Sequence, residues 1–176
     1  MEQKQIRADY DDRHITVYQA YSPAIADPAL AAGRFVPPFK PGRMTWVKPS
    51  FLWMMYRSGW GAKPDQERVL AVRITRSGFD WAVRAAVPSD EGVGRKPDVR
   101  VQWDPERGLH LQALPHRSLQ LGLAGEASRR YVEEWVVGLT DVTPLAHRVH
   151  ALVRAGDLDA ARALLPVERP YPEPSG

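Results

Sequence analysis

The chain has 176 residues, of which 44% are apolar, so its length and composition fit one compact domain with a hydrophobic core of its own. It contains no cysteine and no run of about eighteen apolar residues, which excludes disulfides, thiol nucleophiles and thiolate metal sites and gives no indication of a membrane span. A formal charge of +3, carried mostly by arginine, makes phosphate-bearing partners such as DNA or RNA candidates, and the polar N-terminus favours the cytoplasm.

The first forty residues predict a strand followed by a helix. Residues 15–21 alternate in polarity and are rich in β-forming side chains, which is typical of a strand. Ser22 and Pro23 are typical of a helix start, and Gly33 of a helix end. Because proline has no amide hydrogen, we expect Pro28 to interrupt or restart this helix.

The centre of the chain, residues 43–60, holds three of the six tryptophans and three of the four methionines. Residues 45–47 are β-formers, and Pro49 and Ser50 suit the entrance of a helix that Gly59 ends. Because this helix is apolar on nearly all sides, we expect other elements to cover it.

Two interpretations of residues 43–60 follow from their side chains. In the first, the aromatic and methionine side chains simply form the core. In the second, the edges of the segment line a pocket, where aromatic and hydroxyl groups form a wall and cations face an anion. The wall residues are then Trp46, Ser50, Tyr56 and Trp60, and the cations are Arg43, Lys48 and Arg57.

The rest of the chain predicts further strands and helices. Expected strands are residues 68–75, 99–103, 109–114, 118–123 and 136–142, with a turn at 104–108 that joins two of them in a hairpin. Expected helices are residues 77–86, 125–135, 143–155 and 158–165. We expect an exposed loop at 88–98 and a proline-rich tail at 167–176. Because the strands cluster, this order favours a single α+β domain over residues 1–166, with a mixed or antiparallel sheet flanked by helices.

Residues 43–60 also carry a resemblance to a known family. This tryptophan-rich string is similar to the signature of the DUF4291 family, a domain of unknown function, and the resemblance continues over nearly the whole chain. It includes residues 17–21, 66–76, 101–107, 117–123, 134–137 and 141–143. The family name implies no established chemistry.

Common catalytic and metal-binding motifs do not occur in the sequence, including the phosphate loop, the serine elbow and the zinc-binding His-Glu-x-x-His. His147 and His150 lie three residues apart on an expected helix, but no third ligand accompanies them, so we expect no metal. Glu133 and Glu134 are adjacent on an expected helix and diverge by roughly 100°, so they cannot form a facing pair of acids.

The order of elements resembles that of the ADP-ribosyltransferase superfamily. Its members place a polar residue of the first strand, an aromatic residue or serine of the second, and an acid of a later strand around NAD. By this resemblance Gln19 takes the first position, Ser50 and Tyr56 the second, and Gln120 the third. The resemblance therefore implies that NAD is a substrate.

Gln120 is a neutral amide where the superfamily has a glutamate. The negative charge that stabilises an oxocarbenium-like centre would then come from Glu126 or Glu134, or the reaction would differ. The resulting site residues are Gln19, Tyr56, Gln120 and Glu134 for catalysis, and Tyr18, Gln19, Arg43, Trp46, Lys48, Ser50 and Tyr56 for NAD binding. We expect an ADP-ribosyltransferase-like enzyme that acts on a nucleic acid or nucleotide. Two alternatives stay open: a non-catalytic nucleic-acid-binding module whose aromatic side chains stack on bases, and a structural or interaction protein whose aromatic stretch is only core.

Overall fold

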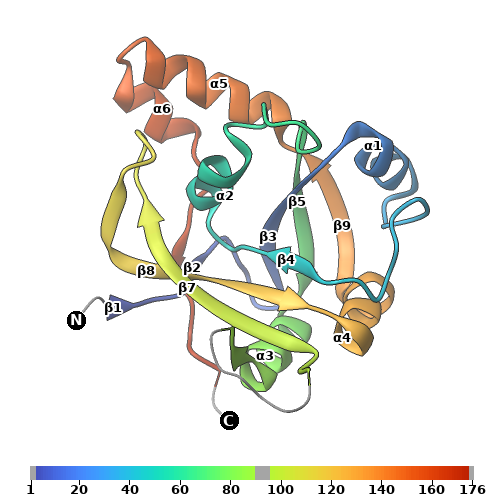
Figure 1. Cartoon of the computed structure of the whole chain (residues 1–176). Helices are drawn as coiled ribbons and strands as arrows, with labels where there is room; N and C mark the ends of the chain where they lie inside the picture. The colour runs from blue at the N-terminus through green and yellow to red at the C-terminus, as the bar shows by residue number, and fades with distance from the viewer. Residues whose placement is uncertain (1–2, 90–95, 175–176) are drawn as a thin grey trace.

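Two main β-sheets, of five and three strands, pack against each other around a hydrophobic core, and helices surround them (Figure 1). The computed structural model describes residues 3–89 and 96–174. Strands and helices are mixed along this chain, as expected, and the single-domain α+β class is confirmed.

The larger sheet is built on an antiparallel pair of long strands, β7 (Val99–Arg107) and β8 (Ala113–Leu123). Strand β4 (Thr45–Val47) pairs antiparallel with β8, whereas β1 (Gln3–Lys4) pairs parallel with it. Strand β6 (Val87–Pro88) pairs parallel with β7. The larger sheet is therefore mixed, as the sequence indicated.

The smaller sheet has the order β3-β5-β9 and is antiparallel throughout. Its strands are β3 (His14–Tyr21), β5 (Arg68–Thr75) and β9 (Val136–Asp141). The two sheets touch where Tyr18 bridges Lys48, whose carbonyl accepts a 2.7 Å hydrogen bond from the Tyr18 amide. This bridge holds the middle of β3 beside the end of β4.

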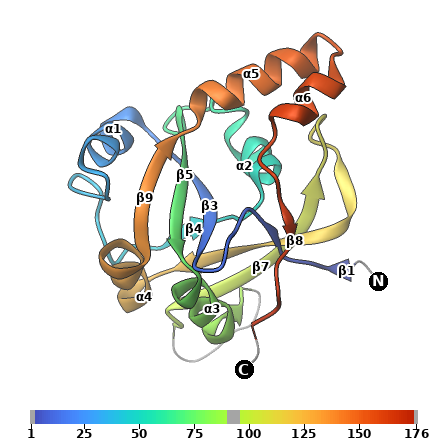
Figure 2. The ribbon, with the colours of Figure 1, turned by 180° about the vertical axis from the view of Figure 1, so that it is seen from behind.

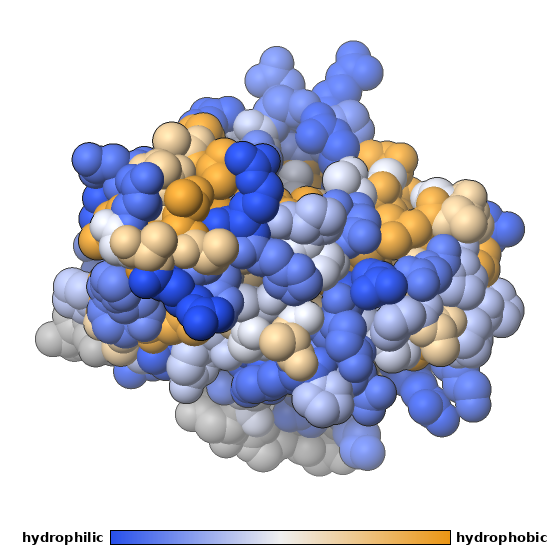
Figure 3. All heavy atoms as spheres, turned by 90° about the horizontal axis from the view of Figure 1, so that it is seen from above, coloured by the Kyte–Doolittle hydropathy of each residue, from blue (hydrophilic) through white to orange (hydrophobic). Residues whose placement is uncertain are grey.

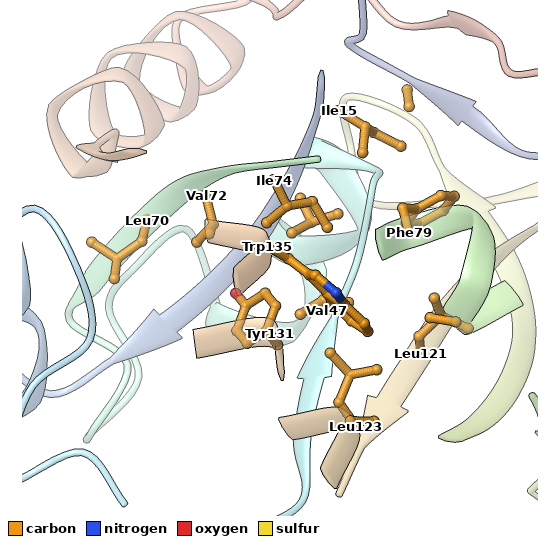
Figure 4. Packing of buried hydrophobic residues seen from close by; sticks show 14 of the residues in the cluster. Ile15, Val47, Leu70, Val72, Ile74, Phe79, Leu121, Leu123, Tyr131 and Trp135 are labelled. Carbon is orange, nitrogen blue, oxygen red and sulfur yellow. The ribbon is translucent and has the colours of Figure 1, made fainter. Parts of the chain in front are cut away.

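The main core lies between the two sheets (Figure 4). Val72 and Ile74 of β5 point into it from one side, and Leu121 and Leu123 of β8 from the other. Because successive side chains of a strand point to opposite faces, Ser118 and Gln120, which alternate with the core leucines of β8, point away from the core. That opposite face of β8 is polar.

Six helices and one π-helical turn surround the sheets in the described part of the chain. They are α1 (Pro23–Ala32), α2 (Phe51–Ser58), α3 (Arg76–Ala85), α4 (Gly125–Arg130), η1 (Tyr131–Trp135), α5 (Thr143–Arg154) and α6 (Leu158–Leu164). The expected helix over 125–135 is observed as α4 continued by η1. Helix α1 runs through Pro28 without the expected break.

Helix α2 begins and ends as its sequence indicated. The Ser50 hydroxyl accepts a 3.0 Å hydrogen bond from the Trp53 amide, so it satisfies a donor that the first turn leaves open. Gly59 ends the helix with φ of 58°, a left-handed conformation that glycine adopts without strain.

Helices α5 and α6 cover α2 through a second apolar cluster. Met55 of α2, Val149 of α5 and Ala161 of α6 are buried together there, beside Tyr18 of β3. Viewed from the side of α5 and α6, the molecular surface carries hydrophilic residues with hydrophobic groups between them (Figure 3). Every helix in the described residues is too short or too polar to span a bilayer.

The expected hairpin turn at 104–108 is wrong. Strand β7 continues to Arg107, the chain turns between Gly108 and Gln112, and β8 starts at Ala113, so the expected strand over 109–114 is mostly this turn. Pro105 is tolerated because the register shifts beside it, and β6 pairs with β7 only at Arg100 and Val101. The extra length of β7 carries Asp104 in the sheet.

The described residues of the C-terminal segment pack on the domain (Figure 2). Strand β10 (Arg169–Pro170) pairs with β2 (Arg7–Ala8), and Tyr171 is only 5% exposed. A carboxylate oxygen of Glu168 accepts a 2.9 Å hydrogen bond from the Phe51 amide at the start of α2. Of the loop expected at 88–98, residues 90–95 lie outside the described residues.

Gly78 allows α3 to pack closely on η1, and replacing it with alanine should destabilise the protein. A Cβ atom at Gly78 would overlap the indole of Trp135, which is buried. We expect Gly78→Ala to lower the free energy of unfolding by about 1–3 kcal/mol through overpacking. Gly138→Ala is the matched control because nothing lies within 4 Å of its added methyl. Equal urea midpoints for the two variants would contradict this prediction.

Candidate functional site

A cavity of about 650 Å³ opens between helix α2 and the polar face of the larger sheet. Its volume is in the usual range of small-molecule sites. Residues from β3, β4, α2, β7 and β8 contribute side chains to its wall. The lining residues are Gln19, Ala20, Tyr21, Met44, Thr45, Trp46, Lys48, Trp53, Met54, Tyr56, Arg57, Gln66, Gln102, Asp104, Arg107 and Gln120.

The floor of the cavity is the face of β7 and β8 that points away from the core. Gln102 and Gln120 are directly opposite each other, so they share that face. Their amide nitrogens donate to Asp104, from Gln102 to Oδ1 at 3.2 Å and from Gln120 to Oδ2 at 3.4 Å. The two amides therefore hold a carboxylate at the floor of the cavity.

Gln19 forms the back wall, and its amide is already engaged by the protein. Its nitrogen donates to the Thr45 hydroxyl at 2.6 Å and to the Trp46 carbonyl at 3.0 Å, and its oxygen accepts from the Tyr131 hydroxyl at 2.6 Å. With 3% exposure, Gln19 fixes β4 against β3. It positions the wall rather than offering free donors to a ligand.

Helix α2 provides the aromatic wall. Trp53, Tyr56 and Arg57 lie three to four residues apart and so project to one side of the helix. Tyr56 is 40% exposed, and the Arg107 guanidinium lies 3.7 Å from the centroid of its ring. This stacked pair presents an aromatic ring and a cation together at the cavity.

Lys48 is buried in the wall, with 6% exposure. Its ammonium nitrogen lies 5.2 Å from the centroid of the Trp53 ring. Burial lowers the pKa of Lys48 to about 7, and the neighbouring Arg57 guanidinium lowers it as well, whereas Asp104 opposes the shift. Near neutral pH the amine is therefore present in both protonation states.

The electrostatics of the cavity favour an anionic ligand. Lys48, Arg57 and Arg107 line it, and Asp104 is the one carboxylate among the described lining residues. His150, which was considered as a metal ligand, stacks on Trp60 with ring centroids 4.9 Å apart. No cluster of three or more metal-ligating side chains occurs within residues 3–89 and 96–174.

Five residues expected at the site lie together in this cavity. They come from four separate segments of the chain and are Gln19, Trp46, Lys48, Tyr56 and Gln120. Long-range pairing brings them together: β3 meets β4 through the Tyr18–Lys48 bridge, and β4 pairs with β8.

The other expected residues lie outside the lining. Ser50 is buried as the cap of α2, and its hydroxyl donates to Glu106 at 2.6 Å. Tyr18 packs its ring against Phe51 in the second apolar cluster. The remaining two are on the surface: Arg43 is exposed, and Glu134 pairs with Arg130 at 3.3 Å.

Sequence reasoning missed Asp104, Gln102 and Arg107. Their signal was the alternation of β7, in which Gln102 and Asp104 are two residues apart and share a face. That signal was hidden because Asp104 and Pro105 are typical turn residues. Gly122, directly opposite Trp46, was missed too: a Cβ there would come within 2.9 Å of the indole, so glycine makes room for the ring.

Comparison with known proteins supports the resemblance to the DUF4291 family. A search of curated proteins finds no match. A family model described as a domain of unknown function, DUF4291, matches residues 5–171, a span that includes every residue of the cavity and every strand of the two sheets except β1. Because this match covers nearly the whole chain, the protein belongs to the DUF4291 family.

Proposed function

We propose that the cavity binds NAD and that the protein transfers the ADP-ribose group of NAD to a nucleic acid or nucleotide. The observation that carries this proposal is the convergence of Gln19, Tyr56 and Gln120 on one cavity with a carboxylate at its floor. The ADP-ribosyltransferase resemblance gives these residues neighbouring positions around NAD. The cavity chemistry supports the same ligand, because aromatic rings suit the bases and cations suit the pyrophosphate.

Asp104 is the residue to which we assign the anionic role. When the bond between nicotinamide and ribose breaks, positive charge develops at the ribose carbon, and a carboxylate nearby stabilises that charge. Gln102 and Gln120 hold Asp104 by hydrogen bonds, so its position is fixed before the ligand binds. Glu126 and Glu134, which the sequence suggested for this role, pair instead with Arg129 and Arg130 on the exposed surface.

Thermal unfolding with NAD tests the binding step. At about a hundred times its dissociation constant, NAD should add roughly 2.7 kcal/mol of stability and raise the melting temperature by about 5–10 °C. Tyr56→Ala should reduce this shift because it removes an exposed ring from the cavity wall. The absence of any shift with NAD would contradict the proposal.

Asp104→Asn tests the chemical step. Asparagine keeps the size of the side chain but removes its charge, so we expect the NAD-induced shift to remain while nicotinamide release falls by about a hundredfold or more. Glu134→Gln is the matched control, since Glu134 is an acid outside the cavity. Loss of nicotinamide release in the control but not in Asp104→Asn would overturn the assignment.

The same thermal-unfolding measurement distinguishes the transferase from the alternative of a nucleic-acid-binding module. Base stacking needs accessible rings, and of the aromatic residues in 43–60 only Tyr56 is exposed, so we place nucleic acid as an acceptor rather than as a stacked ligand. A thermal shift with single-stranded DNA or RNA alone, lost at higher salt, would favour the binding module.

A further inference from the structure

Lys48 differs from the other lysines of the chain in its surroundings. The chain has five lysines, and Lys4, Lys40, Lys63 and Lys96 are exposed, whereas Lys48 is buried in the cavity wall. Buried lysines are rare in proteins unless an acceptor or an acid accompanies them. Its burial therefore requires an explanation.

No side chain or carbonyl of the described residues accepts a hydrogen bond from the Lys48 ammonium, and no carboxylate forms an ion pair with it. The ammonium nitrogen lies 5.2 Å from the centroid of the Trp53 ring, a cation–π contact. Arg57 also lies over the Trp53 ring, at 5.9 Å, so a second cation is close by. Burial and the Arg57 guanidinium disfavour the charged form and outweigh Asp104, which favours it, so the neutral amine with its free lone pair is present near neutral pH.

A desolvated lysine beside another cation is an arrangement that makes an amine nucleophilic. We propose that Lys48 forms an imine with the carbonyl carbon of a phosphorylated aldose bound in the cavity. Arg57 and Arg107 suit the phosphate, and the Gln102 and Gln120 amides with Asp104 suit the sugar hydroxyls. The cations of the wall thus favour a phosphate on the ligand, and the amides and carboxylate of the floor favour sugar hydroxyls.

The reaction balances without an oxidant or a further reactant. The nitrogen lone pair attacks the aldehyde carbon, a carbon–nitrogen bond forms, and the carbonyl electron pair moves to oxygen. Both protons of the amine pass in turn to that oxygen, the carbon–oxygen bond breaks, and water leaves as the carbon–nitrogen double bond of the imine forms. The inference goes beyond the proposed transfer and requires no NAD, although ADP-ribose, formed when water takes the place of the acceptor, also has a free anomeric carbon.

Reductive trapping tests this inference on the wild-type protein. Ribose 5-phosphate with cyanoborohydride at pH 7 should leave a reduced adduct, located by peptide mass spectrometry. At this pH the neutral fraction of the Lys48 amine is about a thousand times that of a lysine with an ordinary pKa. We therefore expect Lys48 to be labelled at least about tenfold faster than any exposed lysine. Unphosphorylated ribose is the matched probe and should label Lys48 more slowly.

Three outcomes would overturn the inference: equal labelling of all five lysines, no adduct at Lys48, or equal rates with ribose and ribose 5-phosphate. Arg57→Gln, checked for folding by circular dichroism, should lower the preference for the phosphorylated probe. Lys48→Arg should abolish the adduct at this position. If NAD causes no thermal shift but Lys48 forms the adduct, the transferase proposal is rejected and this inference stands. If NAD causes the shift but Lys48 forms no adduct, this inference is rejected and the transferase proposal stands.

Discussion

Lys48→Met is expected to make the protein more stable near pH 6, although it removes a residue of the cavity. In the folded protein the pKa of Lys48 is about 7, below the usual value of 10.5, because burial disfavours its charge. Below pH 7 both folded and unfolded chains hold the proton, and the folded chain must bury an ammonium. Methionine fills a similar volume without charge, so we expect a gain of about 2–4 kcal/mol in the free energy of unfolding, after the loss of the Trp53 contact.

The pH dependence of this effect has a definite sign. Between pH 7 and 10.5 the unfolded chain binds the Lys48 proton and the folded chain does not, so wild-type stability from this group rises with pH across that window. Lys48→Met should lack this rise. Urea titrations at pH 6, 8 and 10 measure it, with Lys63→Met as an exposed control. A variant that is less stable than wild type at pH 6 would contradict the prediction.

Glu168→Gln is expected to remove the opposite pH dependence. Burial raises the pKa of Glu168 from 4.5 to about 8, and the nearby Glu106 and Asp9 raise it further, while the hydrogen bond from the Phe51 amide acts against them. Between pH 4.5 and 8 the folded chain holds a proton that the unfolded chain has released. Stability from Glu168 is therefore full below pH 4.5 and is lost as the pH rises to about 8, a change of about 2–4 kcal/mol for this partly exposed residue.

The window from pH 4.5 to 6.5 separates Glu168 from Lys48, since Lys48 is protonated there in both states. Wild-type stability should fall across this window relative to Glu168→Gln, whose amide oxygen still accepts from Phe51 and does not titrate. Glu173→Gln, at an exposed carboxylate of the same segment, is the control. Parallel stability curves for wild type and Glu168→Gln would show that the buried carboxyl does not titrate as expected.

Local sequence signals predicted the elements that depend on a few neighbouring residues. Ser50 and Gly59 set the ends of α2, and the alternation of residues 15–21 gave β3. The turn at 104–108 was wrong because Asp104 and Pro105 are typical of turns, whereas the register shift and the open edge of β7 let the strand continue. The pairing of β7 with β8 therefore outweighed the turn preference of these two residues.

The candidate site was predictable only in part for the same reason. Gln19, Tyr56 and Gln120 were named from the order of elements, but their meeting depends on the pairing of β4 with β8 and the bridge from β3. The burial of Lys48 has no local signal, since a lysine before proline is typical of an exposed extended segment. Asp104 becomes a cavity residue only when Gln102 and Gln120 are opposite each other.

The pairing of β10 with β2 has a consequence for how the protein is made. Ile6 accepts a backbone hydrogen bond from Tyr171, and the Arg7 side chain donates to the Glu168 carbonyl, contacts that span more than 160 residues. A chain still attached to the ribosome cannot form these contacts until residues 168–171 have emerged. The start of α2 therefore lacks its Glu168 partner until these residues have emerged, and we expect the domain to complete its fold only then, as contacts of such sequence separation form late.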